Sequence, residues 1–138
     1  MSNIMQLCEV RDWLKSFNLF EHYYIGKLDQ KQDKSLGVYQ LQASGQPIRA
    51  FNGLSSYSTK KVSLLIHWTK NARETEEIAS ELFEKLLNIE RTKIGEYQVY
   101  FIDMLVPEAQ NVGTDEKGIF EEVIEIEIFY KKERTKKV

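Results

Sequence analysis

The sequence is poor in the residues on which disulfide scaffolds and metal centres are built. Its 138 residues include one cysteine and two histidines. Cys8 has no partner for an internal disulfide, and as a lone thiol it is expected to pack as a small hydrophobe. His22 and His67 have no second histidine or cysteine at the spacing of metal ligands. We therefore expect neither a disulfide-stapled fold nor a metal site, and we assign His67 a structural or surface role.

Long apolar runs and a surplus of one charge are also missing. No apolar stretch approaches the roughly 20 residues that span a bilayer, and residues 1–4 lack the basic and apolar regions of a signal peptide. The 19 basic and 21 acidic residues leave a formal net charge of -2, so no overall field attracts nucleic acid or an anionic membrane. A chain of this length with 42% hydrophobic residues can bury one core. We expect a single soluble domain over residues 1–138, made in the cytoplasm.

The common catalytic motifs are absent as well. The sequence has no Gly-x-Ser-x-Gly nucleophile elbow. Gly45 and Gly53 do not belong to a phosphate-binding loop, because neither a Gly-Lys-Ser/Thr ending nor a strand-to-helix context is present. The many carboxylates lie at positions that strand and helix periodicity assigns to solvent. We expect no enzyme activity, no catalytic residue and no cofactor.

What the sequence does contain is a strong strand-then-helix unit over residues 60–87. Residues 61–69 are rich in β-branched and large apolar side chains, which favour a strand. Asn71 is the expected N-cap of the following helix, and Glu74 occupies the capping-box position three residues later. The helix carries an apolar stripe formed by Ile78, Ala79, Leu82, Phe83 and Leu86. This unit is expected to organise the fold by packing one helix face on a sheet.

The residues before this unit predict a helix and a hairpin. The helix is expected over residues 1–17, with Ser2 or Asn3 as its cap. Residues 23–28 and 36–41 alternate in polarity and are separated by a polar run without periodicity, which is typical of a solvated turn. The two segments are therefore expected to pair as a hairpin.

The residues after the unit predict two further strands. Residues 97–106 form the first, which Pro107 ends because proline has no N–H to donate. A polar loop is expected over residues 108–118, and residues 119–130 alternate as a last strand before a frayed basic tail at 131–138. One face of this last strand carries Glu121, Glu125 and Glu127, and the other carries Ile124, Ile126, Ile128 and Tyr130. The expected fold is α+β, with a mainly antiparallel sheet of about five strands packed against two helices.

Three separated stretches carry a resemblance to a known family. Residues 38–47 form a strand followed by a Gly-x-Pro turn, and residues 57–87 run from a strand into an amphipathic helix through Asn71-Ala72-Arg73-Glu74. Residues 107–130 join a proline, the loop Gly113-Thr114-Asp115-Glu116-Lys117-Gly118 and an alternating strand. Together they resemble the minor capsid and tail terminator (tail completion) proteins of long-tailed phages and prophages of Gram-positive bacteria. The sequence departs from that pattern at Trp68-Thr69-Lys70, where the family often has an arginine.

The resemblance implies a structural protein of the virion with a tail-terminator-like fold. Such a protein is a tail terminator or head-tail joining protein that assembles as a hexameric ring at the end of the tail tube. Its implied partners are other copies of itself, the tail tube protein and head-connector proteins. No membrane and no sequence-specific nucleic acid are implied. The expected location is the virion, after synthesis in the cytoplasm of the bacterial host.

Two groups of residues are the candidate assembly sites. The first is the glutamate face of the last strand, Glu121, Glu125 and Glu127, which lines a DNA-conducting lumen or is an ordinary solvated sheet face. The second is a pair of loops, because loops can become ordered on assembly. Their candidate contact residues are Asp29, Lys31, Asp33, Lys34, Gln110, Asn111, Asp115, Glu116 and Lys117.

Two other functions fit part of the sequence. One is an α+β adaptor or regulatory domain that binds another protein through a sheet edge. The other is RNA binding through aromatic side chains of residues 97–101, as in RNA-recognition domains. The basic residues of that signature are missing, and the neighbouring glutamate-rich strand would repel a phosphate backbone. We therefore rank nucleic-acid binding last.

Overall fold

The structure is a computed structural model that describes residues 4–26, 32–41 and 57–132. Some predictions of the sequence analysis fall elsewhere. Outside the described residues lie the helix caps Ser2 and Asn3, the loop residues Asp29 and Lys31, the turn at 44–47 and residues 133–138 of the basic tail. The frayed tail expected over 131–138 is wrong for its first two residues, because Lys131 and Lys132 belong to the last strand and pair with Gln98 and Tyr97.

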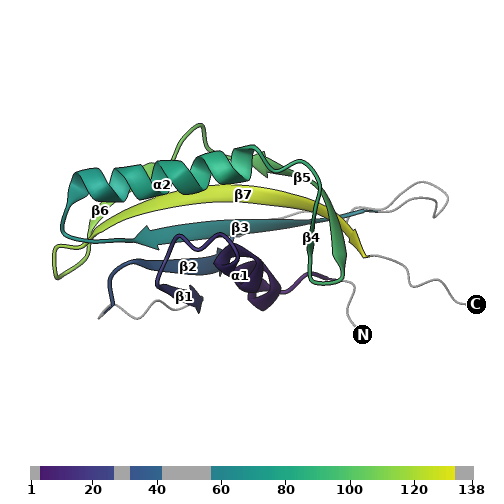
Figure 1. Ribbon diagram of the computed structural model, residues 1–138, viewed down its shortest axis with the longest axis horizontal. Coiled ribbons are helices and arrows are strands. Elements are labelled where there is room, and N and C mark those ends of the chain that lie inside the picture. The colour runs from purple at the N-terminus through teal and green to yellow at the C-terminus, as the bar shows by residue number, and fades with distance from the viewer. Residues whose placement is uncertain (1–3, 27–31, 42–56, 133–138) are drawn as a thin grey trace, which may run out of the picture.

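Within these ranges the chain forms two helices and seven strands (Figure 1). In chain order they are α1 (Leu7–Lys15), β1 (His22–Ile25), β2 (Ser35–Gln40), β3 (Ser58–His67), α2 (Ala72–Leu87), β4 (Thr92–Ile94), β5 (Tyr97–Met104), β6 (Gln110–Thr114) and β7 (Phe120–Lys132). The strands lie in the order β1-β2-β3-β7-β5-β4, and β6 pairs with β7 off this path. The sheet is mixed, because β1 and β2 are parallel while the other pairs are antiparallel.

The predicted α+β class with two helices is confirmed for the described residues, but the number of strands was underestimated. The two additional strands are β4, which lies between the predicted helix and the strand predicted at 97–106, and β6, which lies in the segment 108–118 that was expected to be a loop. β4 has only three residues, and almost every residue of β6 is exposed. Polar side chains on a short edge strand show no alternation, since neither face of the strand is buried.

The predicted hairpin between the first two strands is wrong. His22 of β1 pairs with Ser35 of β2 in parallel, and Ile25 pairs with Val38. β1 is four residues long, so its two ends lie only roughly 13 Å apart, and a parallel neighbour needs only a short return path. A polar run shows that the chain leaves the sheet, but its composition does not fix the direction in which the chain returns.

The first helix begins later than its expected caps at Ser2 and Asn3. Gln6 is the N-cap of α1, and its backbone N–H donates to Glu9 Oε1 at 3.0 Å. The residues before it are held extended by two tyrosines of the sheet. The backbone N–H of Met5 donates to the Tyr130 hydroxyl at 3.0 Å, and the Tyr97 hydroxyl donates to the carbonyl of Ile4 at 3.0 Å. These long-range bonds outweigh the local capping preference.

The second helix begins where the sequence predicts. Asn71 Oδ1 accepts from the backbone N–H of Glu74 at 3.1 Å. The reciprocal bond of a capping box is replaced by two bonds to Thr69. Its hydroxyl donates to Glu74 Oε1 at 3.3 Å and accepts from the backbone N–H of Asn71 at 3.2 Å. The predicted apolar stripe is buried or half-buried against the sheet.

Both helices cover one face of the sheet, which we call the inner face (Figure 1). Burial lowers the pKa of Lys60 on this face, and the charge of Glu9 on α1 opposes that shift. Burial also raises the pKa of Glu122, and Glu76 on α2 and Glu108 add to the rise. The centre of the inner face is fully buried and consists of Val62, Leu64, Ile66, Ile124, Ile126 and Ile128. Each such side chain contributes about 1.5–3 kcal/mol through burial.

Candidate functional site

The opposite face of the sheet, the outer face, is covered by neither helix. The expected alternation along β7 is present, since the isoleucines and Tyr130 are buried while the glutamates are half-exposed. Glu121, Glu125 and Glu127 therefore share the outer face. In the neighbouring strand β3 they lie opposite His67, Ser63 and Lys61. Whether this face lines a lumen stays a prediction.

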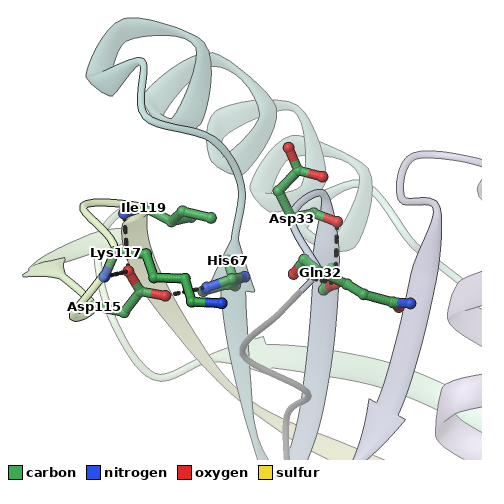
Figure 2. Close-up of polar contacts among 7 residues, drawn as sticks. Gln32, Asp33, His67, Asp115, Lys117 and Ile119 are labelled. Atoms are coloured by element: carbon green, nitrogen blue, oxygen red, sulfur yellow. Dashed lines mark hydrogen bonds and ion pairs between the residues drawn. The ribbon is translucent and has the colours of Figure 1, made fainter.

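One end of the outer face is closed by a buried side-chain contact between His67 of β3 and Asp115 of the β6–β7 turn. The His67 side chain is 0% exposed and that of Asp115 is 7% exposed. His67 Nε2 lies 2.8 Å from Asp115 Oδ2. Asp115 Oδ1 accepts from the backbone N–H groups of Lys117 and Ile119, both at 2.9 Å (Figure 2). We call this arrangement the latch, because it fastens the turn to the centre of the sheet.

The hydrogen bonds of the latch decide the charge state of Asp115. Burial by itself would raise the pKa of this carboxyl, but the hydrogen bonds from His67, Ile119 and Lys117 and the charge of His67 together lower the pKa. Glu121, which lies opposite His67 in the sheet, has the reverse shift. Burial raises the pKa of Glu121, the charge of His67 opposes that rise and Asp115 adds to it. The carboxylate that accepts hydrogen bonds thus stays ionised, whereas its neighbour binds a proton more readily.

A serine also lies beside the latch, but it does not complete a catalytic arrangement. Ser35 of β2 is the other cross-strand neighbour of His67 and is 0% exposed. Its hydroxyl donates to the backbone carbonyls of Gln32 and Asp33 at 3.1 and 3.2 Å. His67 Nδ1 is buried without a partner among the described residues. A buried serine whose proton is engaged elsewhere is no nucleophile. The contact of His67 with Asp115 holds the β6–β7 turn to the sheet.

The latch brings the two predicted assembly loops to one end of the sheet. The backbone N–H of Lys34 donates to the carbonyl of Trp68 at 2.8 Å, next to His67, while Asp115 contacts His67 from the other side. Figure 2 shows Asp33 and Lys117 on either side of His67. Sequence reasoning named both loops but did not foresee that they converge.

The segment 108–118 is not the loop that was expected. Gln110 and Asn111 lie in β6, and only Asp115, Glu116 and Lys117 form the turn. Gly118 has a φ of 83°, which a glycine adopts without strain, and this lets the turn close. The turn is thus fixed by its own domain, which counts against the idea that it becomes ordered only on assembly.

The other end of the outer face is open and aromatic. Phe101 of β5 stacks on Phe129 of β7, with ring centroids 4.4 Å apart, and Tyr57 lies 6.0 Å from Phe129. Phe101 is 48% exposed. One row further along the sheet, Asp103 lies directly opposite Glu127. Among the described residues neither of these carboxylates forms an ion pair, in contrast to Asp115.

Sequence reasoning noted the aromatic side chains of residues 97–101 but did not place Phe101 and Asp103 together on the face away from the core, because residues 97–106 are apolar at most positions. A run without alternation gives no indication of which side chains face away from the core. The signal that was available is the pair Phe101 and Asp103, two residues apart on one strand and therefore on one face.

Other kinds of site find no support in the part of the chain that the structure describes. No three His, Cys, Asp or Glu side chains there converge as metal ligands do. Neither described helix has the length and apolarity needed to cross a bilayer.

A comparison with known families separates the functions that the sequence left open. A family model for the bacteriophage tail terminator protein matches residues 4–132, which include every described helix and strand. No curated protein matches the chain. The family is a structural one, and the match favours a tail protein over an adaptor or an RNA-binding domain. The chain belongs to the bacteriophage tail terminator family and is a structural tail-completion protein of the phage virion.

Proposed function

We propose that this protein assembles as a hexameric ring at the end of the tail tube, where it stops growth of the tube and joins the tail to the head. The observation that carries the proposal is the family match over residues 4–132. The sheet supports it as well, because one face carries no helix and the edges of β1, β4 and β6 have no described strand beside them. Such edges can pair with a neighbouring subunit, and repeated heterologous contacts close into rings.

The partners in this proposal are the tail tube protein and head-connector proteins. The two assembly loops support such contacts, since Asp33 and Lys34 lie at the same end of the sheet as Glu116 and Lys117. A fixed turn costs less ordering entropy on binding than a mobile one. This end of each subunit is the proposed contact to the tube or to the head connector.

The glutamate face is proposed to look toward the lumen of the ring. Glu121, Glu125 and Glu127 give the outer face a row of carboxylates along β7. Negative charge along a channel wall repels the phosphates of DNA, so the genome passes without adhering. The subunit is made in the host cytoplasm and ends in the virion.

Electron microscopy of tails from a phage with this gene intact or deleted tests the proposed function. Overlong tails, or tails without heads, are the expected result of the deletion. Normal tails of normal length joined to heads would contradict the proposal. Complementation with the intact gene is the control, and it should restore the normal length.

A further inference from the structure

Near the latch the sheet has an open strand on each of its two edges. β3 pairs with one edge of β7 and β6 with the other, so β1 and β6 lie on opposite edges of the sheet. The registers place these two strands in the same rows. One row runs from His22 of β1 to Gly113 of β6. A second row runs from Tyr24 to Gln110. No described strand lies beyond either end of these rows.

β1 and β6 also lack the charged residues by which edge strands resist pairing. A charged side chain or a proline on an edge hinders the addition of another strand. β4 carries Lys93, and the open stretch of β5 carries Asp103. β1 and β6 contain no lysine, arginine, aspartate, glutamate or proline. Each instead has an exposed apolar side chain, Ile25 at 36% and Val112 at 53%. An added strand would cover both side chains.

The backbone of β1 has hydrogen-bonding groups directed at its open edge. The N–H groups of His22 and Gly26 donate to carbonyls on the β2 side at 3.3 and 2.8 Å. Consecutive residues of a strand direct their backbone groups to opposite edges. The backbone groups of Tyr23 and Ile25 therefore point away from β2, toward a neighbouring strand.

The directions of the strands fit a head-to-tail contact. β1 runs in the direction of β7, because β1 is parallel to β2, and β2, β3 and β7 alternate in direction. β6 runs opposite to β7 and hence opposite to β1. A neighbouring subunit that is rotated about an axis along the strands keeps both its strand directions and its faces. Its β1 would lie antiparallel to β6, with the glutamate faces of both subunits on the same side.

We propose that β1 of a second copy of this chain adds to β6, so that the rows of one subunit continue into the next around the ring. This inference rests on the proposed function, because it names the subunit contact of the ring. The contact is heterologous, and such contacts close into a ring only without a net shift along the ring axis. β1 and β6 meet this condition because they lie in the same rows. The open stretch of β5, Phe101 to Met104, lies on the same edge as β6 and comes into the same interface.

Cysteine cross-linking in assembled tails tests the contact. The deletion phage is complemented with full-length variants that carry Cys8→Ser, which removes the native thiol. Tyr24→Cys of one subunit is combined with Gln110→Cys of the next. Paired residues of neighbouring antiparallel strands have Cα atoms about 4.5–5.5 Å apart, which suits a disulfide. Within one subunit the two positions are four strand spacings apart, about 19 Å, which is too far for a disulfide.

The expected cross-links depend on which variants share a tail. Oxidised tails that contain both single variants should yield covalent dimers on a non-reducing gel, and either variant alone should yield none. A chain with both substitutions should yield a ladder of covalent oligomers. Asp103→Cys combined with Tyr24→Cys is the matched control and should give no dimer, because Asp103 lies further along the same edge. Normal tails without the expected cross-link would overturn the contact. Dimers from Gln110→Cys alone would overturn it too, since they would indicate a reciprocal contact.

Lysine substitutions test the same contact if the cysteine variants form no tails. Ile25→Lys and Val112→Lys each place a charge on an uncharged edge at an exposed position. Each variant should be folded by circular dichroism and should lower the number of plaques in complementation at least about tenfold. Leu87→Lys, at an exposed apolar position of α2, is the matched control and should complement as the wild type does. Folded edge variants that complement like the wild type would overturn the contact.

The proposed function is judged separately by the tail lengths of the deletion phage without complementation. Overlong tails in the deletion, together with complemented tails of normal length that do not cross-link, would leave the function in place and reject this contact alone.

Discussion

The two ends of the outer face differ in the burial and the partners of their carboxylates. At the latch, Asp115 is buried, accepts three hydrogen bonds and pairs with His67. At the aromatic end, Asp103 is exposed and faces another carboxylate, Glu127. Hydrogen bonds to charged groups contribute about 1.5–3 kcal/mol to stability, whereas exposed charge pairs contribute about 0–1 kcal/mol. The latch therefore stabilises the subunit and fixes the turn at the proposed tube or connector contact, whereas the carboxylates of the aromatic end are left available for assembly.

The largest effect is expected from Asp115→Ala. The substitution leaves the His67 ring and two backbone N–H groups without their acceptor, so it should destabilise the subunit by about 3 kcal/mol. Urea unfolding measures the change. Glu116→Ala, one residue along the same turn but exposed, is the control and should stay within about 0.5 kcal/mol of the wild type. Equal losses of stability in the two variants would contradict the role of Asp115 in holding the turn to the sheet.

The latch should also make the free energy of unfolding depend on pH in the acidic range. The folded-state pKa of Asp115 is depressed, so its contribution is complete above the unfolded value of about 3.9 and is lost as pH falls through the lower folded value. Urea unfolding between about pH 2 and pH 6 follows this loss. Asp115→Asn should flatten the slope below about pH 4. The same slope in wild type and variant would show that the latch carries no charge.

Glu122 shows how burial without hydrogen-bond donors among the described residues changes the pKa of a carboxyl and its contribution to stability. Glu122 is only 3% exposed and has a raised pKa, since burial and the charges of Glu76 and Glu108 oppose its ionisation. Its protonated form stabilises the fold, and that contribution is lost as pH rises from the unfolded pKa through the folded pKa. Glu122→Gln should therefore stabilise the protein by about 1 kcal/mol at pH 7 and by nothing below about pH 4. Destabilisation at pH 7 would indicate that Glu122 has a partner after all.

The smallest change in stability is expected from Asp103→Asn at the aromatic end, and its sign should be opposite to that of the substitutions in the latch. Asp103→Asn removes a like-charge pair from the surface of the sheet, so the isolated subunit should gain about 0.2–0.5 kcal/mol. The same type of substitution at Asp115 should destabilise the subunit. Thermal unfolding of both variants in one buffer compares the signs. A clear loss of stability in Asp103→Asn would mean that this end also belongs to the internal framework.

The sequence predicts the parts of the fold in which one face is buried along a whole element. β3, α2 and β7 were located because burial imposes alternation on a strand and a three-to-four-residue spacing on a helix. β4, β6 and the parallel direction of β1 were not found, since short edge strands bury no continuous face. Gln6 replaced the expected caps because Tyr97 and Tyr130, far along the chain, hold the residues before it.

The candidate site was predictable in its residues but not in its arrangement. The loop residues and the glutamate face can be read from composition and alternation. The pairing of His67 with Asp115 joins positions 48 residues apart, and nothing local in the sequence specifies it. The place of the aromatic side chains on the outer face could not be predicted, because β5 is apolar at most positions on both faces. Contacts that depend on strand order therefore required the structure.

Amide hydrogen exchange of the free subunit and of assembled tails tests the division of the outer face most directly. The amides of Lys117 and Ile119 should be protected equally in both samples, because the latch is formed before assembly. The amides of β5 from Phe101 to Met104, at the aromatic end, should gain protection only in tails. Protection that appears at the turn on assembly, with β5 unchanged, would contradict the account and reverse the roles of the two ends.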